Sequence, residues 1–189
     1  MDLSPLLSPV PVVLSRKHHK VSHYFAVDEL ELRFANGLVK TYERLPAGRG
    51  AVLAVPFDGT HFYLVSEYAC GFERYELGFV KGKIDEGETP DAAVRRELEE
   101  EIGYGCNQAT LLKDEMTVAP GMMALKMFCY LCTDLYPHVL KTGDEPEPIR
   151  LVKITPDEAR DLAFSKDSPL TESRSVACLL LAMHQLGMI

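Results

Sequence analysis

Three glutamates between positions 97 and 101 are the side chains of this sequence best suited to bind a metal ion. Glu97, Glu100 and Glu101 fall on one face of a helix with about 3.6 residues per turn. Cβ atoms four positions apart lie ~5–6 Å from each other, so Glu97 and Glu101 can reach the same cation or bridge two. Ligation by oxygen atoms alone favours Mg²⁺ or Mn²⁺ over zinc. The run is also typical of a solvated acidic helix face, and helix geometry alone leaves both interpretations open.

The helix that carries these glutamates has signals at both ends. Thr89 is a suitable N-cap, Pro90 has the fixed φ angle favoured at the first helical position, and Gly103 suits a C-terminal stop. These signals predict a helix from about Pro90 to Ile102. Beside the glutamates runs an apolar stripe, made of Val94, Leu98 and Ile102. One stripe is expected to enter a core, and the other to face a cleft.

Extended segments on both sides of this helix predict a sheet. Residues 51–56 are a continuous apolar run of strand length, and residues 62–67 return after the Asp58-Gly59 turn. The apolar run describes a central strand of a covered sheet. Further strands are expected at 75–80, 109–112, 126–133 and 149–154, and further helices at 156–163 and roughly 169–186.

The N-terminal segment predicts a β-hairpin that follows an irregular tail. Residues 30–34 alternate apolar and polar side chains, Asn36-Gly37 supplies a tight turn, and residues 38–44 return as a second extended run. Prolines before residue 13 predict a tail without regular structure. The stretch 16–23, with histidines among basic residues, is either a phosphate-facing patch or a solvated loop.

The chain length of 189 residues fits one ordinary domain plus an appendage. A cluster of structure-breaking residues at 46–50 marks the junction. The expected domains are therefore an N-terminal arm and hairpin at 1–48 and a main domain at 49–189. Hydrophobic residues make up 47% and charged residues 25%, which indicates a globular protein with a substantial core.

Net charge and apolar segments argue against several kinds of partner. The formal net charge of -8 and the pI near 5.3 argue against nucleic acid or an anionic membrane surface as a main partner. The longest apolar run, 176–183, is far shorter than the ~20 residues of a membrane span. No secretory leader precedes the five scattered cysteines, so a cytoplasmic location is expected.

The complete spacing around the helix resembles the Nudix box of hydrolases that act on nucleoside diphosphates linked to another group. Five residues separate Gly82 from Glu88, seven separate Glu88 from Arg96, and the box ends at Gly103 and the residue after it. Tyr104 stands where the family usually has an aliphatic residue, a difference expected to affect packing and not chemistry. The resemblance implies an α/β Nudix fold, a mixed β-sheet sandwiched between helices (α/β/α), with the N-terminal antiparallel strands as an appendage.

The resemblance extends well beyond the box. Pro120, sixteen residues after Tyr104, is similar to the proline that marks the ADP-ribose pyrophosphatase branch of the family. The segments YELGFVKG, DLYP and GDEPEP, together with the overall length, resemble enzymes of this branch that act on ADP compounds. The resemblance implies a Mg²⁺-dependent hydrolase that cleaves the pyrophosphate bond of ADP-ribose, NADH or short diadenosine polyphosphates into AMP and a phosphorylated remainder.

The same resemblance implies a role for each residue of the site. Expected metal ligands, for Mg²⁺ or Mn²⁺, are Glu97, Glu100, Glu101, Glu147 and the backbone carbonyl oxygen of Lys81. Expected catalytic residues are Glu145 as the base, Glu100 and Arg96. Expected substrate-binding residues are Arg44, Glu76, Gly82 and Pro120. Structural roles in the box are expected for Gly82, Glu88 and Gly103.

The resemblance also implies a homodimer through the N-terminal hairpin, whose strand edges would allow it.

Two other functions stay open. A non-catalytic Nudix module that senses an ADP-ribose-like ligand would tend to lack the box glutamates, which are all present here. A Nudix enzyme with a different substrate, such as a nucleoside triphosphate or coenzyme A, is disfavoured by Pro120.

Overall fold

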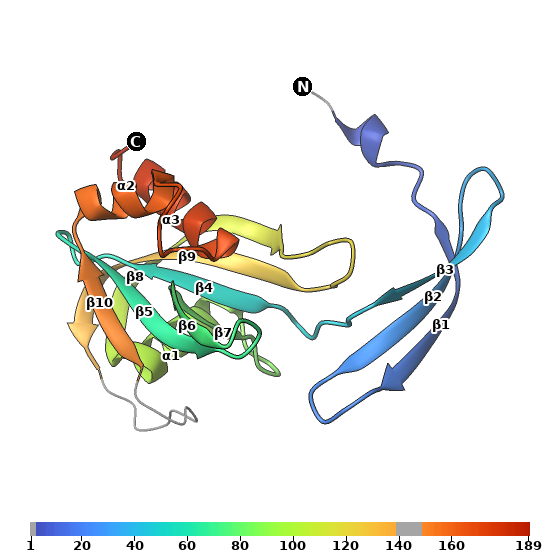
Figure 1. Cartoon of the computed structure of the whole chain (residues 1–189), viewed down its shortest axis with the longest axis horizontal. Helices are drawn as coiled ribbons and strands as arrows, with labels where there is room; N and C mark the ends of the chain where they lie inside the picture. The colour runs from blue at the N-terminus through green and yellow to red at the C-terminus, as the bar shows by residue number, and fades with distance from the viewer. Residues whose placement is uncertain (1–2, 139–148) are drawn as a thin grey trace. The chain divides into compact units, whose positions relative to one another are not determined.

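The structure is a computed structural model that describes residues 3–138 and 149–189 (Figure 1). These residues divide into two compact units. The first unit combines Met1–Gly48 with Thr117–Leu125, and the second combines Arg49–Met116 with Lys126–Ile189. The segment Thr117–Leu125 thus joins the N-terminal unit although it lies far along the chain.

The first unit is built on a three-stranded antiparallel sheet with the order β1-β2-β3. Its strands are β1 (Val12–Lys20), β2 (Ala26–Arg33) and β3 (Val39–Arg44). The pair β2 and β3 confirms the predicted hairpin, and Gly37 in its turn has a φ of 84°, a conformation that favours glycine. Leu45 forms a parallel bridge with Met123, which ties the segment Thr117–Leu125 to this unit.

Two predictions for the N-terminal residues are wrong. The proline-containing tail includes a short 3₁₀ helix, η1 (Ser4–Leu7), with Pro5 in its first turn. The stretch 16–23 is mostly strand, because β1 pairs with β2 along its length. Every residue of β1 is exposed, so this strand has no buried face to impose an alternating pattern on its sequence. Pairing with β2, and not local sequence, defines it.

The second unit contains two sheets. A four-stranded mixed sheet has the order β7-β4-β9-β8, in which β4 runs antiparallel to β7 and parallel to β9. A three-stranded antiparallel sheet has the order β10-β5-β6. The strands are β4 (Ala51–Pro56), β5 (Phe62–Ala69), β6 (Arg74–Gly78), β7 (Val80–Lys83), β8 (Tyr104–Thr117), β9 (Lys126–Pro137) and β10 (Arg150–Ile154). The predicted strand at 75–80 is divided between β6 and β7, which belong to different sheets.

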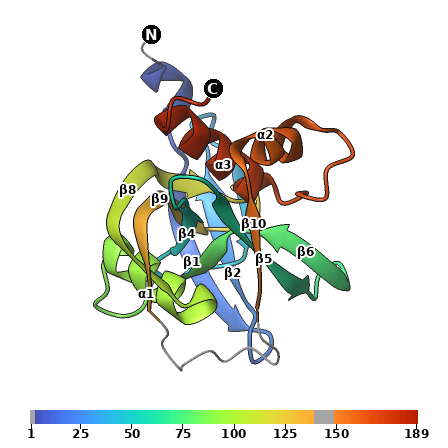
Figure 2. The same cartoon turned by 90° about the vertical axis from the view of Figure 1, so that its left-hand side faces the viewer.

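Helices cover both faces of the mixed sheet in this unit. The helix α1 (Pro90–Ile102) packs against β7 and β4, whereas α3 (Ser173–Gln185) packs against β4 and β9, with α2 (Pro156–Phe164) beside it. Figures 1 and 2 show α1 on one side of the strands and α2 and α3 on the other. The predicted α/β/α arrangement with a mixed sheet is confirmed.

The strand β4 supplies core residues to both helical layers. Val52 and Ala54 are fully buried in a cluster with Val94 and Leu98 of α1. The alternate residues of β4 are also fully buried, and side chains alternate between the two faces of a strand. The continuous apolar run of β4 therefore follows from its position between two layers of helix. Among the described residues, no helix is long and apolar enough to cross a membrane.

Candidate active site

The helix α1 has the bounds and caps expected from its sequence. The hydroxyl oxygen of Thr89 accepts a hydrogen bond from the backbone N–H of Ala92 at 3.2 Å. Gly103 ends the helix with a φ of 69°, and its N–H donates to the carbonyl of Glu99 at 3.2 Å. Leu98 is fully buried, so the helix is held by its apolar stripe while the glutamates lie on the adjoining face.

Gly82 lies directly against the Glu97 side chain. A Cβ atom at position 82 would stand 1.9 Å from Cδ and Oε1 of Glu97, far inside contact distance. Gly82 is fixed by pairing with Val52 of β4, and Glu97 is fixed on α1. The glycine is therefore required by close approach of a strand to a side chain, and not by an unusual backbone angle.

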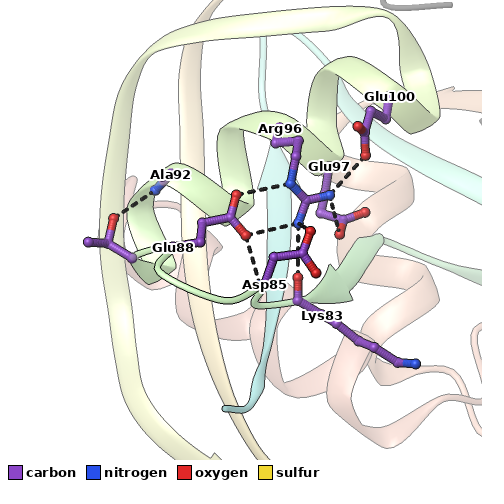
Figure 3. Close-up of polar contacts among 8 residues, drawn as sticks. Lys83, Asp85, Glu88, Ala92, Arg96, Glu97 and Glu100 are labelled. Carbon is purple, nitrogen blue, oxygen red and sulfur yellow. Dashed lines mark hydrogen bonds and ion pairs between the residues drawn. The ribbon is translucent and has the colours of Figure 1, made fainter. Parts of the chain in front are cut away.

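Arg96 connects α1 to the loop before it (Figure 3). Its Nε and Nη2 donate to both carboxylate oxygens of Glu88, at 2.9 and 3.0 Å, and Nη2 also donates to the carbonyl of Lys83 at 3.0 Å. Its Nη1 donates to Glu97 at 2.8 Å and to Glu100 at 2.9 Å. The Glu88 carboxylate and its neighbours raise the pKa of Arg96 above its ordinary value. The guanidinium group thus fixes the orientation of two carboxylates of the glutamate face.

Glu88 is held in turn by the loop. The backbone N–H of Asp85 donates to Glu88 Oε2 at 3.0 Å, and the Arg96 guanidinium holds the pKa of the Glu88 carboxyl below its ordinary value. Glu88 is therefore an ionised brace between the loop and α1. The contribution of the Asp85 and Lys83 backbone groups was not apparent from the sequence, since any residue type supplies an N–H and a carbonyl.

The carboxyl group of Glu101 is partly buried and lacks a full set of partners among the described residues. Its Oε2 atom is buried and accepts no hydrogen bond within the described part of the chain. Burial raises the pKa of the Glu101 carboxyl to about 9, the nearby Glu67 and Glu97 carboxylates add to the shift, and Lys81 opposes it. Burial likewise raises the pKa of Glu97. Two adjacent carboxyl groups that resist ionisation in this way fit a divalent cation with oxygen ligands, which would compensate their charge.

Lys81 approaches the same carboxyl group through its backbone. A backbone hydrogen bond from Lys81 stabilises the charged form of Glu101, and the Lys81 ammonium donates to Glu67 Oε2 at 3.2 Å. The sequence resemblance pointed to the Lys81 backbone but gave no role to Glu67 or to the ammonium group. The position of Glu67 on β5, next to Ser66, carried no signal for this pairing.

The remaining predicted site residues make their described contacts outside the glutamate face of α1. Glu76 of β6 accepts hydrogen bonds from Arg74 and from Thr171. Arg44 and Pro120 belong to the first unit, where the Arg44 side chain donates to the buried carboxylate of Asp28 at 3.3 Å. Glu145 and Glu147 lie outside the described residues.

Tyr104, the departure from the usual box, has aromatic and cationic partners. Its ring packs edge-on against Tyr63 with centroids 5.3 Å apart. The ammonium group of Lys153 on β10 lies 5.7 Å from the Tyr104 centroid and 4.2 Å from that of Tyr63. The tyrosine therefore joins β8 to β5 and β10 through ring contacts, in agreement with the expected effect on packing.

Comparison with known protein families defines the class of this chain. The NUDIX domain family matches residues 48–172, and the family described as the NudE-type Nudix hydrolase N-terminal domain matches residues 11–44. The chain belongs to the Nudix hydrolase family. This finding confirms the interpretation of residues 82–104 as a Nudix box.

Two relatives and one solved structure show which members of the Nudix family this chain is similar to. The chain is 41% identical to the ADP compounds hydrolase NudE of Escherichia coli over 177 residues, which cover 93% of both chains. It is 29% identical to the ADP-ribose pyrophosphatase of Bacillus subtilis over 144 residues, or 75% of each chain. A crystal structure of an ADP compounds hydrolase superposes with a TM-score of 0.86 at 39% identity, covering 96% of this chain and 98% of that one. The predicted resemblance to Nudix enzymes that act on ADP compounds is confirmed.

Proposed function

We propose that this chain hydrolyses the pyrophosphate bond of ADP-linked compounds, such as ADP-ribose, NADH and short diadenosine polyphosphates, giving AMP and a phosphorylated remainder. The carboxylate cluster on α1 carries the proposal, because Glu101 has a buried oxygen that finds no partner in residues 3–138 and 149–189, beside the carboxyl of Glu97. The relatives named for ADP compounds and ADP-ribose support this substrate class.

The proposed cofactor is Mg²⁺, with Mn²⁺ as the alternative, because the donor set consists of oxygen atoms. Its proposed ligands are Glu97, Glu100, Glu101, Glu147 and the backbone carbonyl oxygen of Lys81. When bound, such a cation would neutralise the charge of the pyrophosphate and lower the pKa of a water molecule. The orphaned oxygen of Glu101 and the raised pKa of Glu97 fit this role.

The residues of the chain position the reacting groups. Arg96 holds the carboxylates of Glu97 and Glu100 in fixed orientations, and Glu88 fixes Arg96 by a two-point ion pair. Gly82 leaves the space that the Glu97 side chain occupies. We assign the role of general base, which accepts the proton of the attacking water, to Glu145. Arg44, Glu76, Gly82 and Pro120 remain the proposed substrate-binding residues.

A product assay tests the proposed function. The protein is incubated with Mg²⁺ and with ADP-ribose, NADH, diadenosine triphosphate or dATP, and AMP is quantified by chromatography. AMP is expected from the three ADP-linked compounds, with much slower turnover of dATP. Failure on all three ADP-linked compounds would favour a non-catalytic module that senses an ADP-ribose-like ligand, and a preference for dATP would favour a different nucleotide substrate.

Millimolar Mg²⁺ is expected to raise the melting temperature. A cation that binds only the folded state at ~100 times its Kd adds about 2.7 kcal/mol of stability, which corresponds to roughly 5–11 °C for a chain of this size. The measurement is a thermal melt with Mg²⁺ and with chelator. Glu101→Gln is expected to lose this shift, whereas superimposable wild-type curves with and without Mg²⁺ would contradict the metal site.

We also propose a homodimer formed through the first unit. Only Asp28 and Leu30 are buried among the described residues of its three strands. Large apolar side chains are exposed on β1 and β3, among them Leu14 at 42% and Tyr42 at 46%. A small sheet with so little buried area needs a partner surface, and exposed apolar patches of this kind mark protein interfaces.

A cytoplasmic location is proposed because all five cysteines are free.

Light scattering on a size-exclusion column tests the dimer. The wild-type protein is expected at twice the mass of one 21.1 kDa chain. Leu14→Glu is expected to shift the protein to the monomer, because it places a charge on the exposed apolar face of the sheet. Leu111→Glu, at a 46% exposed position of β8 in the second unit, is the matched control and should remain dimeric. A wild-type monomer would contradict the proposal.

A further inference from the structure

A pocket of about 550 Å³ lies in the second unit, between the hairpin of β5 and β6 and the start of α3. Its walls include Tyr68, Phe72, Arg74, Glu76, Thr171 and Arg174. The hydroxyl of Thr171 donates to Glu76 Oε2 at 2.5 Å and so joins the two walls across a sequence separation of 95 residues. The volume is in the range of small-molecule sites and suits one nucleoside better than a whole dinucleotide.

The charges that line this pocket are balanced. Three ion pairs contribute to it: Arg74 with Glu76, Lys81 with Glu67, and Arg174 with Glu172. Each cation already has a carboxylate partner, so a phosphate group could bind only by displacing one of them. The pocket therefore suits a neutral group that offers hydrogen-bond donors, and not a second phosphate.

An exposed aromatic ring stands at the rim of the pocket. Phe72, in the turn between β5 and β6, is 73% exposed, and the guanidinium carbon of Arg74 lies 5.5 Å from its ring centroid. Tyr68, also exposed, lines the same pocket. A ring of this size that is left in solvent beside a pocket is a stacking surface for a planar base.

One end of the pocket meets the glutamate cluster. Lys81 and Glu67 line the pocket, and the residue after Lys81, Gly82, lies directly against the Glu97 side chain. A substrate with its pyrophosphate at Glu97 and Glu101 would therefore place one of its two nucleoside halves beside Phe72 and Glu76. Glu76 can accept further hydrogen bonds, since each carboxylate oxygen has two lone pairs and the described residues place one donor on each.

We propose that this pocket holds the base and ribose of one nucleoside of the substrate, and that the Glu76 carboxylate selects a ribose without a 2′-phosphate. The inference rests on the proposed function and specifies its substrate. Carboxylates bind ribose hydroxyls in sites that accept unphosphorylated dinucleotides, whereas an available arginine accommodates a 2′-phosphate. Here Arg74 and Arg174 are both held by carboxylates, so a 2′-phosphate would lie beside Glu76 and Glu172 with neither arginine free to bind it.

The test compares kcat/KM for NADH and NADPH. The wild-type enzyme is expected to prefer NADH by about tenfold or more, because both arginines are already held by carboxylates and no cation of the pocket is left to bind the phosphate. Glu76→Gln is expected to reduce this preference to within about threefold, since it removes one carboxylate and releases Arg74 from its ion pair. Glu73→Gln, which removes an exposed charge from the same turn outside the pocket, is the matched control and should keep the wild-type preference.

Two further measurements make the test independent of folding defects in one variant. Phe72→Ala is expected to raise KM for NADH by about tenfold with little change in kcat, as for loss of a stacked base. Calorimetry on the wild-type protein is expected to show weaker binding of adenosine 2′,5′-bisphosphate than of AMP. Equal kcat/KM for NADH and NADPH in the wild type would overturn the inference and leave the proposed function intact. An enzyme inactive on every ADP-linked compound would overturn both.

Discussion

Glu97→Gln is expected to lower kcat on ADP-ribose by about 10³-fold or more, because loss of a metal-binding carboxylate removes several kcal/mol of transition-state stabilisation. Glutamine has the same size and can still accept a hydrogen bond from Arg96, so the packing of α1 should be preserved. The charge is what is lost. Far-UV circular dichroism and a melting curve would show an intact fold beside the loss of turnover.

Glu86→Gln is the matched control for this result. The Glu86 side chain is 94% exposed and pairs with Arg49 at 3.2 Å on the surface, four residues beyond Gly82 in the same loop region. The same chemical change there should leave kcat within about twofold of the wild type, since exposed ion pairs contribute little. A Glu97→Gln enzyme that kept most of its rate would remove Glu97 from the proposed metal site.

Gly82→Ala is expected to lower kcat by about 10²-fold and to destabilise the fold by roughly 1–3 kcal/mol. The added Cβ would stand 1.9 Å from Cδ of Glu97, so one of the two must move. Since β7 is held by its pairing with β4 and α1 by its buried stripe, the Glu97 carboxylate is the group that gives way. It would then leave both Arg96 and the proposed cation.

Kinetics and thermal melts on Gly82→Ala are compared with those on Gly48→Ala. A Cβ at Gly48 would meet nothing within 4 Å, and Gly48 has no positive φ angle. The control substitution should therefore leave both kcat and the melting temperature close to wild type. Normal activity of Gly82→Ala would mean that the position of the Glu97 carboxylate is not critical for turnover.

Local sequence was sufficient to determine the helix and several strands. Thr89, Pro90 and Gly103 act within one turn of the helix ends, and their chemistry does not depend on the rest of the chain. The bounds of α1 and of β4 were therefore predictable from residues that lie inside or beside them. The Nudix box was recognisable for the same reason, because its spacing is a property of one continuous segment.

The charge state and surroundings of the site residues needed the tertiary structure. The glutamate face could have been a solvated surface, and burial, together with the nearby Glu67 carboxylate, is what gives Glu101 its raised pKa. Only the packing of β7 against α1 explains why position 82 tolerates no side chain.

What the sequence by itself determined is thus the box, its helix and the class of chemistry, since hydrogen bonds and caps within a few residues specify them. Only the tertiary structure decided which distant residues share a surface. The strand β1 forms because it pairs with β2. The pocket beside Glu76 forms because Thr171, 95 residues further along the chain, contacts β6. Such contacts form between segments far apart in the chain, and no periodic pattern within one segment indicates which other segment it will contact.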